Sequence, residues 1–284
     1  MIYLIVPAYN EAQNLPDLLA ALTRWSQDCH EQCHVIVVDD GSTDGTENIL
    51  EGFKGLPLTV VRHSPNKGVA KAFESGLGAW AAKTVEPLDL VVTLEADNTS
   101  SLEFLDTMVR RARSGYDVVL ASCYAPGGEV VGTNRLRTVL SFCANLILRC
   151  TPGMPKVYTF SSFYRVYRGP FLRHVLAAYG ERMIQEAGFV CVVEMLLKFG
   201  ACGARICEVP FRLDGSFRKG ASKMLVRRTI LGYFRFFLRA TVGLVAQPQV
   251  EPAAQHSRLV DKGIDARRGL SQPAVTTEVQ AGGD

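Results

Sequence analysis

Short apolar runs alternate with longer amphipathic stretches along the first part of the chain. A continuous run of β-branched residues is typical of a strand buried in a parallel sheet, and apolar residues every three or four positions are typical of a packed helix. The runs predict strands at Ile2–Val6, Val35–Asp39, Leu58–His63, Leu88–Leu94 and Asp117–Ala121, with helices between them at Asn14–Trp25, Asp44–Phe53, Val69–Ala82 and Ser101–Ser114. This alternation predicts an α/β fold with a doubly wound, mostly parallel sheet.

Beyond Tyr124 the regular alternation stops. The pattern there predicts helices at Thr138–Leu148, Phe171–Tyr179, Ala187–Phe199 and Leu225–Leu244, a strand at Ala204–Phe211 and a mobile basic loop at Gly215–Ser222. The tail from Gln247 mixes Pro, Gln, Ala, Gly and charged residues, a composition that favours disorder. We therefore divide the chain into a main domain (1–223), an amphipathic helix (224–246) and a disordered tail (247–284).

The helix predicted at Leu225–Leu244 carries four arginines among its aromatic residues. Charges at this density argue against a membrane-spanning helix and favour one that lies in the membrane interface. From Arg205 to Arg239 there are nine Lys and Arg residues against two acids, which indicates an anionic surface or substrate. The alternative is a helix packed on the domain with its arginines exposed.

The bulk composition narrows the class of protein. An apolar content of 48% can supply a large core, and a net charge of +3 gives no indication of nucleic-acid binding. Met1 is followed at once by an apolar strand without a basic region, so no signal peptide is expected. The eight cysteines are then expected to be reduced thiols of a cytoplasmic protein.

Two of the apolar runs end on carboxylates. Val35–Val38 leads into Asp39 and Asp40, and Leu90–Leu94 leads into Glu95, Ala96 and Asp97. Ligands of open α/β sheets bind beyond the carboxyl ends of the strands, so these acids are expected at the active-site edge. Acids placed together repel each other, so a positive charge must offset them. The pattern indicates a metal ion and the phosphates that it would bridge.

The turns that follow the first three strands carry the resemblance to a known family. The segments are Pro7-Ala8-Tyr9-Asn10-Glu11, Asp39-Asp40-Gly41-Ser42-Thr43-Asp44-Gly45-Thr46 and Asn66-Lys67-Gly68. In this order, they resemble the family 2 glycosyltransferases of the GT-A fold. The resemblance extends over residues 1–240.

Segments further along resemble one group within that family, the polyprenol-phosphate sugar transferases of the dolichol-phosphate mannosyltransferase type. They are Arg137-Thr138-Val139-Leu140-Ser141 with Ala144-Asn145-Leu146, Phe160 to Arg168, Glu194-Met195-Leu196 leading to Glu208-Val209-Pro210, and Arg218 to Met224. The resemblance implies transfer of a hexose, with mannose from GDP-mannose expected, to a polyprenyl monophosphate at a membrane surface.

The resemblance also implies a role for individual residues. Substrate-binding residues would be Pro7, Tyr9, Glu11, Val37, Asp39 and Asn66 on the nucleotide side, and Ser141 and Lys223 on the acceptor side. The metal, Mg²⁺ or Mn²⁺, would be held by Glu95 and Asp97. The catalytic residues would be Asp97, Arg137 and Arg218, with the two arginines on the acceptor phosphate.

The acceptor chemistry explains why no general base is obvious. A sugar hydroxyl must lose a proton when it attacks, whereas a phosphate monoester, with a second pKa of about 6, is already mostly dianionic at neutral pH. The enzyme then needs only to hold the dianion in line and to stabilise the leaving diphosphate. Arginines suit the first task because of their fork geometry.

Two positions depart from the family pattern, and two alternatives stay open. Glu95 replaces the usual Asp of the metal motif, and Cys123 replaces an arginine in Ser122-Cys123-Tyr124, for which Arg135 is a possible substitute. One alternative is an enzyme with a hydroxyl acceptor, for which Glu194 would be the base. The other is a membrane-associated protein that binds a nucleotide sugar without turnover.

Overall fold

The computed structural model describes residues 1–133, 135–151, 153–220, 226–245 and 247–248. They belong to one compact unit, Met1–Glu251, and the second unit, Pro252–Asp284, lies outside the described residues. The predicted boundary at 223/224 and almost all of the predicted disordered tail also lie outside them. The division into domains therefore stays a prediction.

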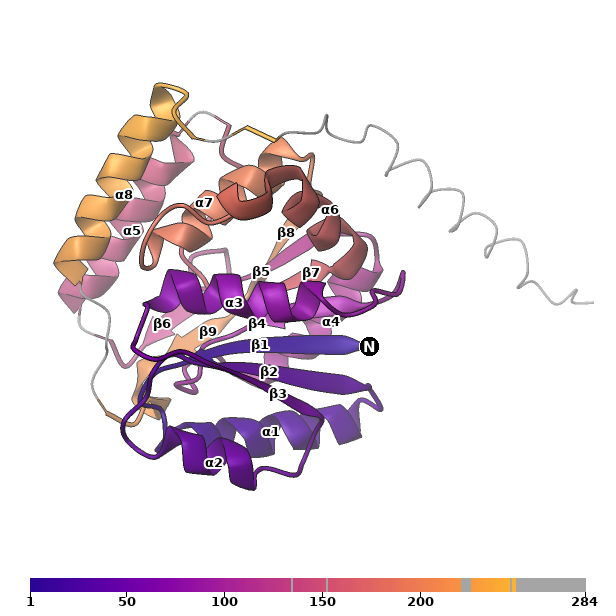
Figure 1. Cartoon of the computed structure of the whole chain (residues 1–284). Coiled ribbons are helices and arrows are strands. Elements are labelled where there is room, and N and C mark those ends of the chain that lie inside the picture. The colour runs from indigo at the N-terminus through magenta and orange to yellow at the C-terminus, as the bar shows by residue number, and fades with distance from the viewer. Residues whose placement is uncertain (134, 152, 221–225, 246, 249–284) are drawn as a thin grey trace, which may run out of the picture. The chain divides into compact units, whose positions relative to one another are not determined.

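A seven-stranded mixed sheet forms the centre of the unit (Figure 1), with the strand order β3-β2-β1-β4-β7-β5-β8. Its strands are β1 (Ile2–Ala8), β2 (Cys33–Asp39), β3 (Leu58–Arg62), β4 (Leu90–Thr93), β5 (Val118–Ser122), β7 (Arg165–Arg168) and β8 (Ile206–Pro210). A small second sheet pairs β6 (Glu129–Val131) with β9 (Arg212–Asp214) in parallel. The predicted α/β fold with a mostly parallel sheet is confirmed.

Helices cover both faces of the large sheet (Figure 1). One face packs against α3 (Val69–Ala81), α6 (Gly169–Tyr179) and α7 (Val190–Ala201), and the other against α1 (Leu15–Asp28), α2 (Thr46–Gly52) and α4 (Leu105–Arg113). Short 3₁₀ turns occur at η1 (Leu102–Phe104), η2 (Gly180–Arg182) and η3 (Gly215–Phe217). Alternate residues of each central strand point to opposite faces, which explains why the strands read as continuously apolar.

The sequence pattern missed β6, β9 and, in the large sheet, β7. Only Val166 and Tyr167 lie between its two arginines, so the run is too short to stand out as a strand. It pairs antiparallel with both β4 and β5. Because it separates them, β4 and β5 run in the same direction, and their carboxyl ends meet at the same edge as those of β1, β2 and β3.

The strand order reverses between β1 and β4. The chain moves outward from β1 through β2 to β3, and then returns to place β4 on the other side of β1. In open α/β sheets the crevice at such a switch point binds the ligand. The turns after β1 and β4, which carry Glu11 and Asp97, flank this switch point, and we refer to the site between these turns as the crevice.

Helices α5 (Arg135–Arg149) and α8 (Val226–Thr241) pack against each other (Figure 1), and α8 also packs on α7. Their outer surface is apolar, with side chains that are 37–67% exposed: Val139, Phe142, Leu146 and Ile147 of α5, Ile230, Leu231, Phe234 and Leu238 of α8, and Val242 and Leu244 after it. None of the helices within the described ranges is long and apolar enough to cross a membrane. We refer to these ten side chains as the α5–α8 surface.

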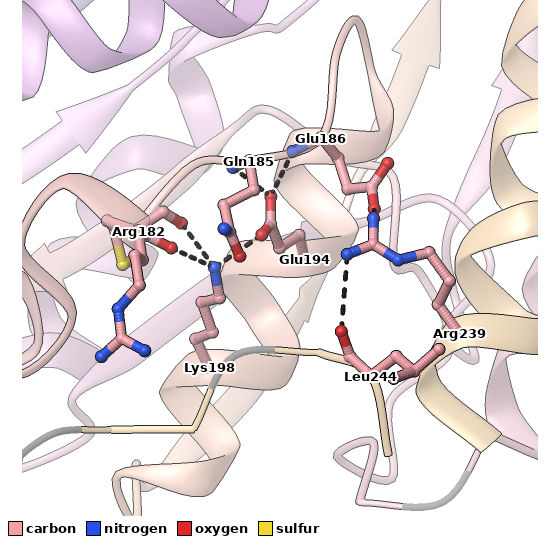
Figure 2. Close-up of polar contacts among 8 residues, drawn as sticks. Arg182, Gln185, Glu186, Glu194, Lys198, Arg239 and Leu244 are labelled. Atoms are coloured by element: carbon pink, nitrogen blue, oxygen red, sulfur yellow. Dashed lines mark hydrogen bonds and ion pairs between the residues drawn. The ribbon is translucent and has the colours of Figure 1, made fainter. Parts of the chain in front are cut away.

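A buried ion pair lies within α7, and both of its partners hydrogen-bond to the turn that precedes the helix (Figure 2). The ammonium of Lys198 lies 2.5 Å from Glu194 Oε1 and 2.5 Å from the carbonyl oxygen of Arg182, and both charged side chains are at most 2% exposed. The other oxygen of Glu194 accepts the backbone N–H groups of Gln185 and Glu186 at 2.9 and 2.8 Å. Burial lowers the pKa of Lys198, although the charge of Glu194 opposes this change.

The same turn also contacts α8. The carboxylate of Glu186 pairs with Arg239, whose guanidinium also reaches the carbonyl oxygen of Leu244 at 3.4 Å (Figure 2). The buried pair therefore fixes the backbone at Gln185 and Glu186, and the side chain of Glu186 holds the end of α8 through Arg239. Charged groups with this many donors and acceptors are costly to unpair, because one charge would remain buried alone.

Replacing Glu194 with Gln tests the buried pair. The substitution removes the charge that Lys198 faces and keeps the shape of the side chain, so we expect the free energy of unfolding to fall by about 3 to 5 kcal/mol. Urea denaturation with linear extrapolation measures the change. The control is Glu186→Gln, in the half-exposed pair with Arg239, for which we expect a loss of at most about 1 kcal/mol. Equal losses for the two variants would contradict this account.

Candidate functional site

The turns after β1 and β2 are locked together by hydrogen bonds. The backbone N–H of Asn10 donates to Ser42 Oγ at 2.9 Å, and the side-chain oxygen of Asn10 accepts the N–H of Thr43 at 2.7 Å. The N–H of Glu11 donates to Thr46 Oγ1 at 3.0 Å. The sequence motifs that carried the resemblance therefore meet in space, and they form one rigid wall of the crevice.

The turn after β3 packs against the same wall. Gly41 has a φ of +74°, and a Cβ added there would lie only 2.7 Å from the backbone nitrogen of Asn66. Only glycine permits both this conformation and this approach. Asn66 itself is exposed at the tip of the turn. The structure thus brings together the three turns that were expected to bind the nucleotide.

The two acids at the end of β2 have different surroundings. Asp40 is buried, and its carboxylate accepts the backbone N–H groups of Lys67 and Gly68, both at 2.8 Å, and lies 2.7 Å from His63 Nδ1. Asp40 therefore holds the third turn in place. Asp39 accepts the N–H of Ser42 at 3.0 Å and is 5% exposed at the edge of the crevice.

The remaining nucleotide-side candidates differ in accessibility. Tyr9 is 37% exposed, Glu11 is 9% exposed, and Pro7 is half-buried at the end of β1. Val37 is fully buried in the core cluster that includes α1, so its side chain packs the sheet and does not line an open surface. It supports the position of Asp39, two residues further along β2.

The metal-motif acids lie on the turn directly after β4. The hydroxyl of Thr99 is 2.7 Å from Asp97 Oδ1 and 3.4 Å from Glu95 Oε2, and the N–H of Thr99 also donates to Asp97 Oδ1 at 3.1 Å. One hydroxyl within hydrogen-bond distance of both acids means that the carboxylates face the same space. The sequence reasoning missed Thr99, and its only signal was a hydroxyl residue two positions after the second acid.

Arg218 reaches this turn from far along the chain. Its guanidinium forms an ion pair with Asp97, with Nε donating to Oδ2 at 2.7 Å. The preceding strand, β9, is attached to the same turn by a bridge between Ser100 and Leu213. Asp214 accepts the N–H of Ser216 at 3.0 Å and so starts the 3₁₀ turn that leads to Arg218.

The basic segment predicted to be a mobile loop, Gly215–Ser222, makes long-range contacts in its described part, Gly215 to Gly220, and its mobility stays a prediction. Besides the Arg218–Asp97 pair, the ammonium of Lys219 lies 2.7 Å from Asp17 Oδ2 on α1. Glycine and basic residues in a short segment predict mobility when no partner is visible in the sequence. Here the partners lie 121 and 202 residues away.

Two acceptor-side candidates, Arg137 and Ser141, lie on α5, which Tyr124 joins to the segment after β5. Tyr124 donates its hydroxyl to the carbonyl oxygen of Thr138 at 3.4 Å and packs edge-on against Phe142. Ser141 is half-buried, and its carbonyl oxygen accepts the side-chain N–H of Asn145 at 2.8 Å.

Three acceptor-side candidates cannot be placed in the same way. The side chains of Arg137 and Arg135, both in α5, and all of Lys223 lie outside the described part of the structure. Among the described interactions, none joins Ser141 to Asp97 or Arg218. Their roles on the acceptor phosphate therefore stay predictions.

Two further residues from the sequence reasoning have clear surroundings. Cys123 is 9% exposed, and burial raises its pKa to about 11, so it is a neutral thiol at physiological pH and supplies no positive charge. Glu194 is 2% exposed, and its carboxylate is occupied by Lys198 and two backbone N–H groups. The hydroxyl-acceptor alternative thus loses the base that was assigned to it.

Comparison with known proteins agrees with this geometry. The family model of glycosyl transferase family 2 matches residues 3–176, which includes the crevice turns after β1, β2, β3 and β4. The chain is 28% identical over 226 residues to a polyprenol monophosphomannose synthase from Mycolicibacterium smegmatis, covering 78% of this chain and 79% of the relative. It is 29% identical over 208 residues to an undecaprenyl-phosphate mannosyltransferase from Micrococcus luteus, covering 72% and 80%.

A solved structure shows the same fold. Glucosyl-3-phosphoglycerate synthase from Mycobacterium tuberculosis, in complex with Mn²⁺, UDP and glucosyl-3-phosphoglycerate, superposes with a TM-score of 0.55 at 18% identity, covering 87% of this chain and 81% of that one. At this identity the likeness shows the GT-A fold alone. The matched family model, together with the turns that meet at the switch point, shows that this chain belongs to glycosyl transferase family 2.

Proposed function

We propose that this protein transfers mannose from GDP-mannose to a polyprenyl monophosphate, with inversion, at the cytoplasmic surface of a membrane. The contact between Arg218 and Asp97 is the observation that supports this most strongly, because it joins a cation suited to phosphate to an acid suited to a metal. Two relatives are named for mannosyl transfer to polyprenyl carriers. Identity below 30% leaves the sugar and the acceptor as part of the proposal.

On the donor side, the wall formed by the first three turns would bind the nucleotide. Asp39 would accept hydrogen bonds from the base or the ribose, beside Tyr9 and Glu11. Asn66 would contribute from the exposed third turn. Because these turns are cross-linked by hydrogen bonds between backbone N–H groups and side-chain oxygens, the pocket would be formed before the donor arrives, which lowers the ordering cost of binding.

The acids after β4 fit a divalent cation. Mg²⁺ usually takes one or two carboxylates together with substrate phosphates, and Glu95 and Asp97 supply two carboxylates that face the same space. Within the described residues there is no cluster of three or more His, Cys, Asp and Glu that would form an all-protein cage. A bound Mg²⁺ or Mn²⁺ would stabilise negative charge on the leaving diphosphate.

On the acceptor side, the arginines would hold the phosphate dianion in line with the anomeric carbon. One phosphate oxygen forms a bond to that carbon while the bond to the nucleoside diphosphate breaks, and the electron pair leaves with the diphosphate. No proton is removed from the nucleophile, so the reaction needs no base in this crevice. Arg218 would bind one side of the acceptor phosphate, and Arg137 and Lys223 remain the further candidates.

The ion pair with Arg218 would also affect how tightly Asp97 binds a metal ion. A guanidinium and a divalent cation bind the same carboxylate, so each weakens the binding of the other. When no other cation is near, the ion pair offsets the charge of a carboxylate that is only 8% exposed. Arg218 would be released toward the acceptor phosphate when Asp97 has another cation.

The α5–α8 surface would lie on the membrane. Ten large apolar side chains, each at least 37% exposed and carried by two helices that pack together and the segment after them, are unusual on a soluble protein and mark an interaction surface. The exposed Arg235 of α8 would meet anionic lipid head groups. Because α5 also carries Ser141 and Arg137, the same helix would contact the lipid and place its phosphate near the crevice.

A transfer assay with matched acceptors tests the reaction. With GDP-mannose and Mg²⁺, we expect mannose to appear on polyprenyl phosphate but not on the corresponding polyprenol, which lacks the phosphate. The rate should rise with pH through the acceptor's second pKa, about 6, and then stay level, because the dianion is the nucleophile. Thin-layer chromatography of the lipid extract measures both results.

Site variants in the same assay test the role of Asp97, and the products distinguish the proposed function from its two alternatives. Asp97→Asn should lower the rate by about 100-fold or more, because it weakens stabilisation of the leaving group. Glu103→Gln, which changes an exposed acid six positions further along, is the control and should be neutral. Transfer to polyprenol would favour a hydroxyl acceptor. Nucleotide-sugar binding without any release of diphosphate nucleotide would favour a binding protein. Either result would overturn the proposal.

Vesicle sedimentation tests the membrane contact. We expect the wild-type chain to bind vesicles that contain anionic lipid, and the double variant Phe142→Ser/Phe234→Ser to bind at least about 100-fold more weakly, since each buried Phe contributes about 1.5 to 3 kcal/mol. Leu88→Ser is the matched control, because Leu88 is 74% exposed and precedes β4 at the opposite edge of the sheet. Equal binding by the double variant and the control would contradict the assignment.

A further inference from the structure

Asn14 lies at the residue before α1, where an asparagine usually caps the helix. Its side chain makes no cap hydrogen bond and is buried, with the residue only 2% exposed. The amide instead contacts Glu11 in the turn after β1 and the backbone of the segment that carries Arg218. Burying a polar amide is costly unless its atoms are hydrogen-bonded, so the partners of Asn14 indicate what the residue does.

The side chain of Asn14 pairs with the backbone of Lys219. Its Oδ1 accepts the N–H of Lys219 at 2.9 Å, and its Nδ2 donates to the carbonyl oxygen of the same residue at 3.1 Å. The pairing is reciprocal, like that of two opposite residues in an antiparallel ladder. It fixes the backbone of the residue next to Arg218 in both position and orientation.

Asn14 also contacts the other two segments of the crevice. Its Nδ2 donates to Glu11 Oε2 at 2.7 Å, and its own carbonyl oxygen accepts the side-chain N–H of Asn98 at 2.9 Å. Asn98 directly follows Asp97 and has a φ of +62°, so the metal turn is bent toward Asn14. One residue therefore contacts the nucleotide turn, the metal turn and the Arg218 segment.

Only an amide of this length fits these partners. The site requires one acceptor and two donors, and a neutral side-chain amide supplies them. Aspartate could still accept the N–H of Lys219, but it would lose both donors and place a negative charge beside Glu11. Alanine would leave the backbone of Lys219 without its partners.

We propose that Asn14 is a positioning residue that couples the donor half of the crevice to the acceptor half. It does not touch the reacting atoms. It holds the Arg218 segment at a fixed place relative to Glu11 and Asp97, so that the cation for the acceptor phosphate is aligned with the bound donor. The inference rests on the proposed function, because it assigns Arg218 to the acceptor.

The coupling predicts that loss of Asn14 affects acceptor binding and nucleotide binding unequally, and this difference can be measured. Loss of Asn14 leaves the cross-linked donor wall intact, since Asn10, Ser42 and Thr46 hold it together. It frees the Arg218 segment, so the acceptor phosphate meets a cation that is no longer held in place. Acceptor binding and alignment should therefore suffer far more than nucleotide binding.

The experiment compares Asn14→Ala and Asn14→Asp with the control Asp17→Asn in the full-length chain. Asp17 contacts the same residue, Lys219, but through an exposed ion pair of little energetic weight. We expect Asn14→Ala to raise the KM for polyprenyl phosphate by about tenfold, which corresponds to about 1.4 kcal/mol. The Kd for GDP, measured by calorimetry, should change by less than about twofold, well under that energy, and Asp17→Asn should match the wild type.

A second readout does not depend on activity. Trypsin cleaves after Arg218 and Lys219, and the hydrogen bonds to Asn14 should protect these bonds in the wild type. We expect cleavage at this position to be faster in both Asn14 variants, with mass spectrometry identifying the fragments. If the wild type transferred no sugar to polyprenyl phosphate, the proposed function would fail, and faster cleavage in the variants would still support the structural coupling.

Two outcomes would overturn the inference. The first is a parallel loss of GDP binding and acceptor KM in Asn14→Ala, because the residue would then support the whole site without coupling its halves. The second is unchanged tryptic cleavage in both variants. Asn14→Asp guards against a folding defect, since it preserves the size of the side chain and the contact with the N–H of Lys219.

Discussion

The ion pair between Arg218 and Asp97 is the interaction on which the crevice depends. The sheet places Asp39, Asp40 and Asp97 at one edge, where like charges repel and resist burial. Each is offset locally: Asp40 by backbone N–H groups and His63, Asp39 by the N–H of Ser42, and Asp97 by Thr99 and the guanidinium of Arg218. Arg218 comes from a segment 121 residues away, so its pair with Asp97 connects an acid of this edge directly to the acceptor side.

The rest of the fold supports that connection. The reversal of strand order places the turns after β1 and β4 on either side of one crevice, and the short pair β6–β9 brings the chain back to it. On the face of the sheet that α7 covers, the buried Glu194–Lys198 pair fixes the turn that holds the end of α8 (Figure 2). The crevice and the exposed α5–α8 surface are thus parts of one packed structure, as an enzyme with a soluble donor and a lipid acceptor would require.

Much of this architecture could be predicted from the sequence, because buried parallel strands are continuous apolar runs and acids at their ends are easy to find. Val35–Val38 and the acids after it are the clearest case. Strand β7 could not be predicted, since Arg165 reads as a surface residue although it is fully buried and donates to the carbonyl oxygens of Phe160 and Val192. The partners of Asn14 and Arg218 were also hidden, because they lie 205 and 121 residues away.

Mn²⁺ binding tests most directly whether Arg218, from the acceptor side, and a metal ion, from the donor side, compete for the carboxylate of Asp97. Electron paramagnetic resonance reports free Mn²⁺ during titration with the nucleotide-free protein. If Arg218 competes for the carboxylate, Arg218→Met should bind Mn²⁺ more tightly than the wild type, by about threefold or more, whereas Asp97→Asn should bind it more weakly. Equal or weaker binding by Arg218→Met would contradict the account, because Arg218 would then not compete for Asp97.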